Sequence, residues 1–485
     1  LIKYYPKMNQ QRYEKLSLVD NVNVDGPPDL QQIEEAQYDE QLDKIVALRN
    51  DKPFPISRPP PKARDWGYAV IFLLHFGGIL LLSLIEQGSL HHSLISYNRA
   101  SSWASMVMII TLLGSFLGAS FVFIMGWQTF RDILLSSSIP FSLILKICLG
   151  NILLIMRSIY SFLGVLVILS AVVDTFWNKS ARDGVNFSSA LVQMVIDTTR
   201  LYGMSFLVMC ASMICLQTLI LLWWGSFFIG LTATVPIGYA VLFIFPMVIS
   251  LYWITQFFNS FMAFVVGGCV LWVFVREEGD KVHFSQKLLL YVQCALTTSL
   301  GSICKGALTS PFAQGVLSLH HWVVRRPQSS VHHCCSLRGA TARLLPQALI
   351  DWAERHHRLS FCLTALYGRA FCSSAQSLLE SHRETLDICI EDSTYFLLSN
   401  TAVVAAGVVA IVFGLVAERG EGSSWPLFFF VSYYLAYCGV SLAVHTYSSA
   451  VDALIVASTI NPMKFAHENQ IIFLRFLRTS ESELR

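Results

Sequence analysis

Long uninterrupted apolar runs dominate the chain from residue 66 onward. An α-helix rises 1.5 Å per residue, so about 20 apolar residues cross a hydrocarbon layer roughly 30 Å thick. Ten runs come close to this length or exceed it: 66–85, 103–125, 133–156, 159–176, 202–229, 235–252, 257–275, 289–323, 397–416 and 427–459. They are apolar on all sides, whereas barrel strands alternate with period two. The sequence therefore predicts an all-α, polytopic integral membrane bundle of about ten transmembrane helices.

The charge content supports this class of fold. Only 14% of the 485 residues are charged, and the formal net charge is +2. A soluble domain carries about 25% charged residues, so the composition argues against an ordinary cytosolic enzyme. Binding to nucleic acid requires a clustered basic face that neutralises phosphates. The near-zero balance argues against that partner as well.

The polar segments divide the chain into five parts. Residues 1–65 are polar and end in a Pro-rich run, which predicts a largely disordered cytosolic tail. Residues 66–324 hold the first eight predicted spans, and residues 397–460 hold the last two. Between them, 325–396 is predicted to be an Arg-rich helical segment at the cytosolic membrane surface, and 461–485 a cytosolic C-terminal tail.

Basic residues predict the orientation, because loops rich in Lys and Arg stay on the cytoplasmic side. They collect before the first run, in a loop with six arginines, and after the last run: Arg58, Lys62 and Arg64; residues 325–358; Arg475 and Arg478. Both termini are therefore expected to be cytoplasmic, in the plasma membrane or an organelle membrane.

Segment 289–323 leaves two topologies open. If the basic segment before it is also cytoplasmic, this run must enter the bilayer and return on the same side. Pro311 lies near its middle and would permit a bend or a re-entrant turn there.

Two ionisable residues stand out inside the predicted spans. A charge at the centre of a bilayer costs about 2.5–3.5 kcal/mol on insertion scales. Lys305 and Asp452 lie well away from the polar flanks of their runs. They could pair with each other or line a path through the membrane.

Aromatic residues, 13% of the chain, could supply a cation site. The faces of Trp and Tyr rings attract quaternary ammonium ions, with about 2 kcal/mol or more once the ion is desolvated. The alternative role of such residues is packing or anchoring at the membrane interface.

A cluster of metal-ligand residues falls between two predicted spans. His332, His333, Cys334 and Cys335 invite a zinc interpretation, but adjacent ligands at this spacing match no tetrahedral zinc pattern. Palmitoylation of the paired cysteines is the alternative. The sequence shows no Ser-His-Asp arrangement, phosphate-binding loop or paired-carboxylate site. We therefore expect neither a metal nor a cofactor, and no enzymatic activity.

Five segments together resemble a known family. They are Asp65-Trp66 with Gly77-Gly78, the stretch 251–256 leading to Val266-Gly267, the stretch 300–307, the Tyr-Gly-Arg-x-Phe-Cys-x-Ser-Ala pattern of 367–375, and the stretch 445–454. In order and spacing they resemble the choline transporter-like family, in its compact fungal, plant or protist form. Arg369 stands where that family usually has Lys, and Ala453 where Thr is common.

The resemblance implies transport of choline or a related organic cation, secondary or facilitative, without ATP hydrolysis. On this basis we expect the solute to be bound by Trp253, Gln256, Tyr367, Tyr447 and Asp452, with Lys305 as a gating or ion-pair residue. The competing hypothesis is a membrane scaffold or lipid-handling protein that does not transport and recruits partners through its tail and Arg-rich loop. The sequence sets no oligomeric state.

Overall fold

The computed structural model describes residues 63–93, 131–155, 164–165, 167–172, 175, 191–196, 203–234, 237–275, 283–324, 346–381, 394–421 and 425–461. Several predictions fall outside these ranges: the span 103–125, most of the N-terminal tail, the His332 to Cys335 cluster and the C-terminal tail. The predicted span 159–176 is described only in part.

Regular structure in the described part of the chain is helical. The elements are α3 (Trp66–Ser93), α6 (Arg131–Ile155), α9 (Gly203–Thr234), α10 (Ile237–Val275), α11 (Phe284–Leu296), α12 (Leu300–Val324), α14 (Gln347–Arg355), α15 (Ser360–Tyr367), α16 (Phe371–Ser381), α18 (Thr394–Glu421) and α19 (Trp425–Ile460). This agrees with the predicted all-α class.

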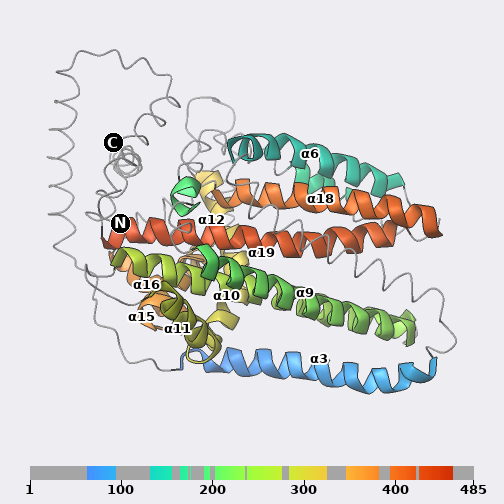
Figure 1. The fold of residues 1–485 in the computed structure, drawn as a ribbon, viewed down its shortest axis with the longest axis horizontal. Coiled ribbons are helices and arrows are strands. Elements are labelled where there is room, and N and C mark those ends of the chain that lie inside the picture. The colour runs from blue at the N-terminus through green and yellow to red at the C-terminus, as the bar shows by residue number, and fades with distance from the viewer. Residues whose placement is uncertain are drawn as a thin grey trace, which may run out of the picture. The chain divides into compact units, whose positions relative to one another are not determined.

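The long helices pack side by side around α19. Helix α19 contacts α18, α10 and α9, while α6 packs on α18 and α3 packs on α12 and α9. Figure 1 shows α3, α9, α19, α18 and α6 with their axes roughly aligned, and α18 and α19 run in opposite directions. The short helix α15 packs against α10, and α16 packs against α15. The C-terminal half of α19 is almost wholly buried, so it forms the centre of the described bundle.

Helix α10 differs from the sequence prediction. The sequence predicts two spans, 235–252 and 257–275, but the structure has one continuous helix, Ile237–Val275. The Thr255 hydroxyl donates to the Leu251 carbonyl at 2.8 Å inside this helix, and Gln256 faces a cavity. The polar residues therefore mark a cavity wall, and the predicted break there was wrong.

The predicted segment 289–323 also bends at a different point. Helices α11 and α12 meet at an angle of 77° across residues 297–299, whereas Pro311 lies inside the continuous helix α12. The hydroxyls of Thr297 and Thr298 donate to the carbonyls of Gln293 and Cys294, which satisfies the last carbonyls of α11 and ends the helix. The pair is either one broken span or a re-entrant loop.

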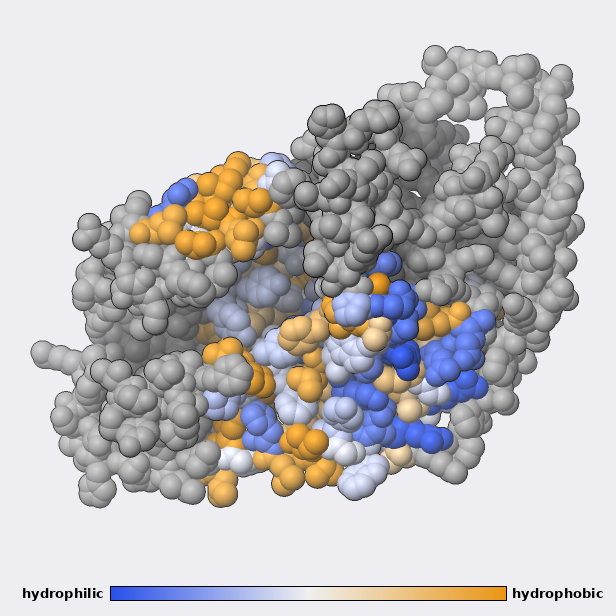
Figure 2. Space-filling model, turned by 180° about the vertical axis from the view of Figure 1, so that it is seen from behind, coloured by the Kyte–Doolittle hydropathy of each residue, from blue (hydrophilic) through white to orange (hydrophobic). Residues whose placement is uncertain are grey.

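Several helices suit a bilayer. In the described residues, Pro246–Val275, Thr394–Ile411 and Tyr433–Ile460 are long and apolar enough to cross a membrane, and the bent pair α11 and α12 would make a fourth crossing. Large apolar side chains such as Leu74, Leu219 and Val408 are exposed. Figure 2 shows apolar side chains gathered in broad areas of the visible face. Together with the candidate spans, these exposed apolar side chains are consistent with a polytopic membrane protein.

Candidate functional site

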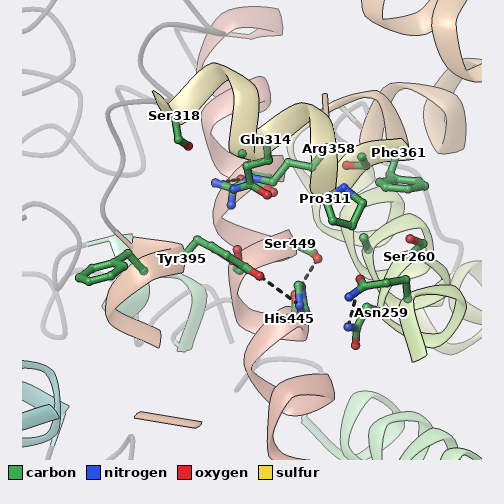
Figure 3. Close-up of a pocket in the computed structure, with 17 residues that line it drawn as sticks. Asn259, Ser260, Pro311, Gln314, Ser318, Arg358, Phe361, Tyr395, His445 and Ser449 are labelled. Atoms are coloured by element: carbon green, nitrogen blue, oxygen red, sulfur yellow. Dashed lines mark hydrogen bonds and ion pairs between the residues drawn. The ribbon is translucent and has the colours of Figure 1, made fainter. Parts of the chain in front are cut away.

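A cavity of about 320 Å³ lies among the helices at the centre of the bundle. Helices α10, α12, α15, α18 and α19 and the turn before α15 supply its walls (Figure 3). The lining side chains include Gln256, Asn259, Gln314, Tyr395, His445 and Asp452. Its volume is at the lower end of the roughly 300–1,000 Å³ of small-molecule sites, which suits a small solute.

An internal ion pair occupies part of this cavity. The Arg358 guanidinium lies 3.0 Å from the Asp452 carboxylate, and their side chains are only 10% and 6% exposed. The guanidinium also lies over the Tyr395 ring, 5.2 Å from its centroid. Arg358 comes from the short turn between α14 and α15, whereas Asp452 lies on α19. The Asp452 carboxylate and the face of the Tyr395 ring therefore bind a monovalent cation here, and this cation is the protein's own Arg358 side chain.

The remaining walls offer neutral polar groups. The Tyr395 hydroxyl lies 3.5 Å from Nε2 of His445, and the Ser449 hydroxyl donates to the His445 carbonyl at 2.6 Å. The amide of Asn259 donates to Gln256 at 3.5 Å. Beside the cavity, burial lowers the pKa of His357 to about 3, with the Arg358 charge as a smaller cause. His357 is thus neutral at physiological pH and adds no second positive charge.

The predicted site residues fall into two groups. Gln256 and Asp452 both line the cavity. Trp253, one turn before Gln256, packs between helices: its indole N–H donates to the Cys304 carbonyl at 3.2 Å, and its ring meets Phe72 of α3 edge-on. The structure thus brings two of the predicted residues together and places Trp253 in a neighbouring apolar cluster.

Tyr367 and Tyr447 are buried and do not line the cavity. Tyr367 ends α15, and the Arg369 guanidinium lies 5.6 Å from its ring centroid.

Sequence reasoning missed Arg358 and Tyr395. Arg358 was counted with a basic loop at the membrane surface, and Tyr395 lies just before the predicted start of its span.

Lys305 pairs with a different acid from the one that the sequence suggested. Its ammonium lies 3.3 Å from Asp65, the residue just before α3. The same carboxylate accepts hydrogen bonds from the Ser302 hydroxyl at 2.9 Å and from the backbone N–H of Phe371 at 3.1 Å. A side chain at Gly301 would collide with the Asp65 carbonyl. We call Asp65, Ser302, Lys305 and Phe371 the Asp65 cluster; it joins the start of α3 to α12 and α16.

Comparison with known protein families gives a match that includes the described helices from α9 to α19. Residues 163–463, more than half of the chain, match the family described as plasma-membrane choline transporter. The chain belongs to the choline transporter-like family. This confirms the resemblance seen in the sequence and shows a family of transporters, not of enzymes. The protein is an integral membrane protein, and the family name indicates the plasma membrane.

Relatives from a protist and from fungi match nearly the whole chain. A CTL-like protein of Dictyostelium discoideum is 21% identical over 476 residues, which cover 96% of this chain and 82% of that protein. The protein PNS1 of Debaryomyces hansenii is 22% identical over 514 residues, with 98% and 96% covered. PNS1 of Mycosarcoma maydis is 20% identical over 446 residues, with 86% and 83% covered.

Trp253 and Gln256 offer a direct test of which side chains meet the solute. Trp253→Phe removes the hydrogen bond to the Cys304 carbonyl and leaves a small void, so we expect a loss of about 1–2 kcal/mol of stability. Because Trp253 does not line the cavity, we expect KM for the solute to change less than twofold. Gln256→Ala should instead raise KM about tenfold, the effect of losing 1.4 kcal/mol of binding, with little change in melting temperature.

Initial uptake rates in proteoliposomes and thermal unfolding in detergent measure both effects. A tenfold rise in KM for Trp253→Phe would instead support the role that the sequence predicted, namely that Trp253 contacts the solute.

Proposed function

We propose that this member of the choline transporter-like family carries choline or a closely related organic cation, and that the cation binds in the cavity between Asp452 and Tyr395. One observation carries the proposal: this carboxylate and this ring already hold a largely buried guanidinium in the cavity. The matched family's description supports the choice of choline.

A quaternary ammonium suits the chemistry of the cavity. Its charge is spread over methyl groups, so it interacts favourably with aromatic faces once it has lost water. Asp452 supplies the opposite charge that a buried cation needs. The amide and hydroxyl groups of Gln256, Asn259 and Ser449 could bond to an alcohol group on the same solute.

The bound cation would replace Arg358 at Asp452. Two cations at one carboxylate would leave an excess positive charge in a dry site, so binding requires the guanidinium to move away. In each state the Asp452 charge is then compensated. Binding of the solute by Trp253, Tyr367 and Tyr447 stays a prediction from the sequence, as does the role of Lys305 as a gating or ion-pair residue.

The proposed topology keeps the predicted orientation. Residues 1–65, the Arg-rich segment and the C-terminal tail are placed on the cytoplasmic side, in accord with the distribution of basic residues. About nine membrane segments are proposed for the whole chain, because α10 joins two of the ten predicted runs, with α11 and α12 as a re-entrant pair. Transport is secondary or facilitative.

Uptake of labelled choline into proteoliposomes tests the proposal. We expect saturable uptake that is inhibited by tetramethylammonium but not by 3,3-dimethylbutanol, the neutral carbon analogue of choline. The combined variant Arg358→Gln with Asp452→Asn should lose at least nine-tenths of this uptake, because the cavity then lacks its negative charge. It is preferred to Asp452→Asn alone, which would leave Arg358 buried without its carboxylate.

Asp351→Asn, which changes a partly exposed acid on α14 hydrogen-bonded to Gln347, is the matched control and should transport normally. No saturable uptake above empty vesicles, or equal inhibition by the neutral analogue, would contradict the proposal. The scaffold hypothesis predicts instead that deletion of residues 1–60 abolishes function, whereas a transporter core should keep its uptake.

A further inference from the structure

A second cluster of titratable groups lies outside the cavity, at the start of α16. Cys372 is the second residue of this helix and is half-buried. The titratable groups that face its thiol are His356, from the turn after α14, and Lys305, from α12. Asp65 lies behind Lys305 and binds it. The apolar helix α3 begins directly after Asp65, so the cluster lies at the end of this helix, and Cys372 is partly exposed there.

The thiol and the imidazole form a direct pair. Sγ of Cys372 lies 3.3 Å from Nε2 of His356. The other ring nitrogen of His356, Nδ1, lies 2.8 Å from the Trp352 carbonyl. A carbonyl can only accept, so Nδ1 carries a proton and Nε2 presents its lone pair to the thiol. The Trp352 ring stacks on the imidazole at 4.7 Å, which holds this orientation.

The surroundings favour the thiolate form. Burial by itself raises the pKa of Cys372, but hydrogen bonds to His356 and Lys305 outweigh it and lower the pKa below its usual value. Burial by itself would likewise lower the pKa of His356, yet its bonds to Cys372 and to the Trp352 carbonyl raise it. The N-terminal end of a helix also stabilises a thiolate. Both pKa shifts act in the direction that moves the proton from the Cys372 thiol towards the His356 imidazole.

Another cysteine nearby shows the contrast. Cys362, on α15, is fully buried, and burial raises the pKa of its thiol. It has no comparable pair of cations in contact. Partial exposure together with two adjacent cations is the environment of reactive cysteines, whereas buried thiols in apolar surroundings are inert.

We propose that Cys372, paired with His356 and Lys305, is a reactive thiol that exchanges with low-molecular-weight disulfides of the glutathione type. The Cys372 thiolate attacks one sulfur of the disulfide. The disulfide bond breaks, a new bond forms to Sγ, and the electron pair leaves on the second sulfur as a thiolate that takes up a proton. Cys372 is oxidised and the leaving sulfur is reduced, so no further reagent is needed.

Incubation of the purified full-length protein with glutathione disulfide, followed by mass spectrometry of the intact protein and its peptides, tests this proposal. Cys294, near the C-terminal end of α11, is the internal reference because it is also half-buried. At pH 7 we expect Cys372 to form its adduct at least about tenfold faster than Cys294. Dithiothreitol should reverse the adduct, and Cys372→Ser should abolish it.

The pH profile separates activation by His356 from simple exposure. The rate at Cys372 should level off at a lower pH in the wild type than in His356→Gln, and this variant should react about tenfold more slowly at pH 7. An adduct at Cys372 that forms no faster than at Cys294, or a His356→Gln profile that coincides with the wild type, would overturn the proposal. The wild-type comparison requires no variant to fold, and none of these readouts depends on transport.

Discussion

Replacing Arg358 by Gln should destabilise the protein by about 3–5 kcal/mol, and adding Asp452→Asn in the same molecule should recover most of that loss. The single change leaves the Asp452 carboxylate buried without the cation that now lies 3.0 Å away. The double variant replaces both charges by amides of similar shape. Asp452→Asn alone should be about as harmful as Arg358→Gln, because it leaves a buried guanidinium. Thermal unfolding of the four proteins in detergent measures the coupling between the two residues.

Choline should show whether Arg358 competes with the solute for Asp452 or has only a structural role. In Arg358→Gln the site at Asp452 and Tyr395 is vacated, so choline should raise the melting temperature of this variant more than that of the wild type. The exposed pair Gln347 and Asp351 is the control, and changes there should stay within about 0.5 kcal/mol. If the double variant is no more stable than the single ones, or if choline stabilises the wild type more, then Arg358 does not compete with the solute.

The sequence predicts the long helices well because a membrane span is a local property. About 20 consecutive apolar residues identify a span without any knowledge of what the helix packs against. Accordingly, α18 and α19 lie close to their predicted bounds. The prediction fails at α10, where the two predicted spans are separated at residues 253–256, which include Thr255 and Gln256. Polar residues on one side of α10 line a cavity that other helices enclose. Their role therefore depends on tertiary structure and cannot be read from the local sequence.

The candidate site was predictable only as far as single residues allow. Asp452 stands out in sequence because a carboxylate inside an apolar run is costly, and it does line the cavity. Its partner Arg358 does not stand out, since an arginine in a basic segment is expected to face water. Lys305 was noticed for the same reason as Asp452, but Asp65 lies outside every predicted apolar run. Which acid meets which base depends on helix packing, which hydropathy does not encode.

Asp65→Asn should destabilise the junction of α3, α12 and α16 by about 2 kcal/mol, the range for hydrogen bonds to a charged group. The carboxylate now accepts from Lys305, Ser302 and the N–H of Phe371. Asp65 has a positive φ of 51°, a conformation that Asn also tolerates, so this change removes charge without adding backbone strain. Asp65→Ala should be worse, because it removes every acceptor and forces Ala into that conformation.

Thermal unfolding in detergent measures the effect, and Lys305→Met provides the second half of a cycle. Lys305→Met alone should lower stability, but added to Asp65→Asn it should cost little more, since the ion pair is already lost. Asp351→Asn, on the exposed side of α14, should stay within about 0.5 kcal/mol of the wild type. A wild-type melting temperature for Asp65→Asn would mean that the Asp65 cluster does not hold α3 to α12. In that case Lys305 would be available to act elsewhere in the transport cycle, as the sequence first suggested.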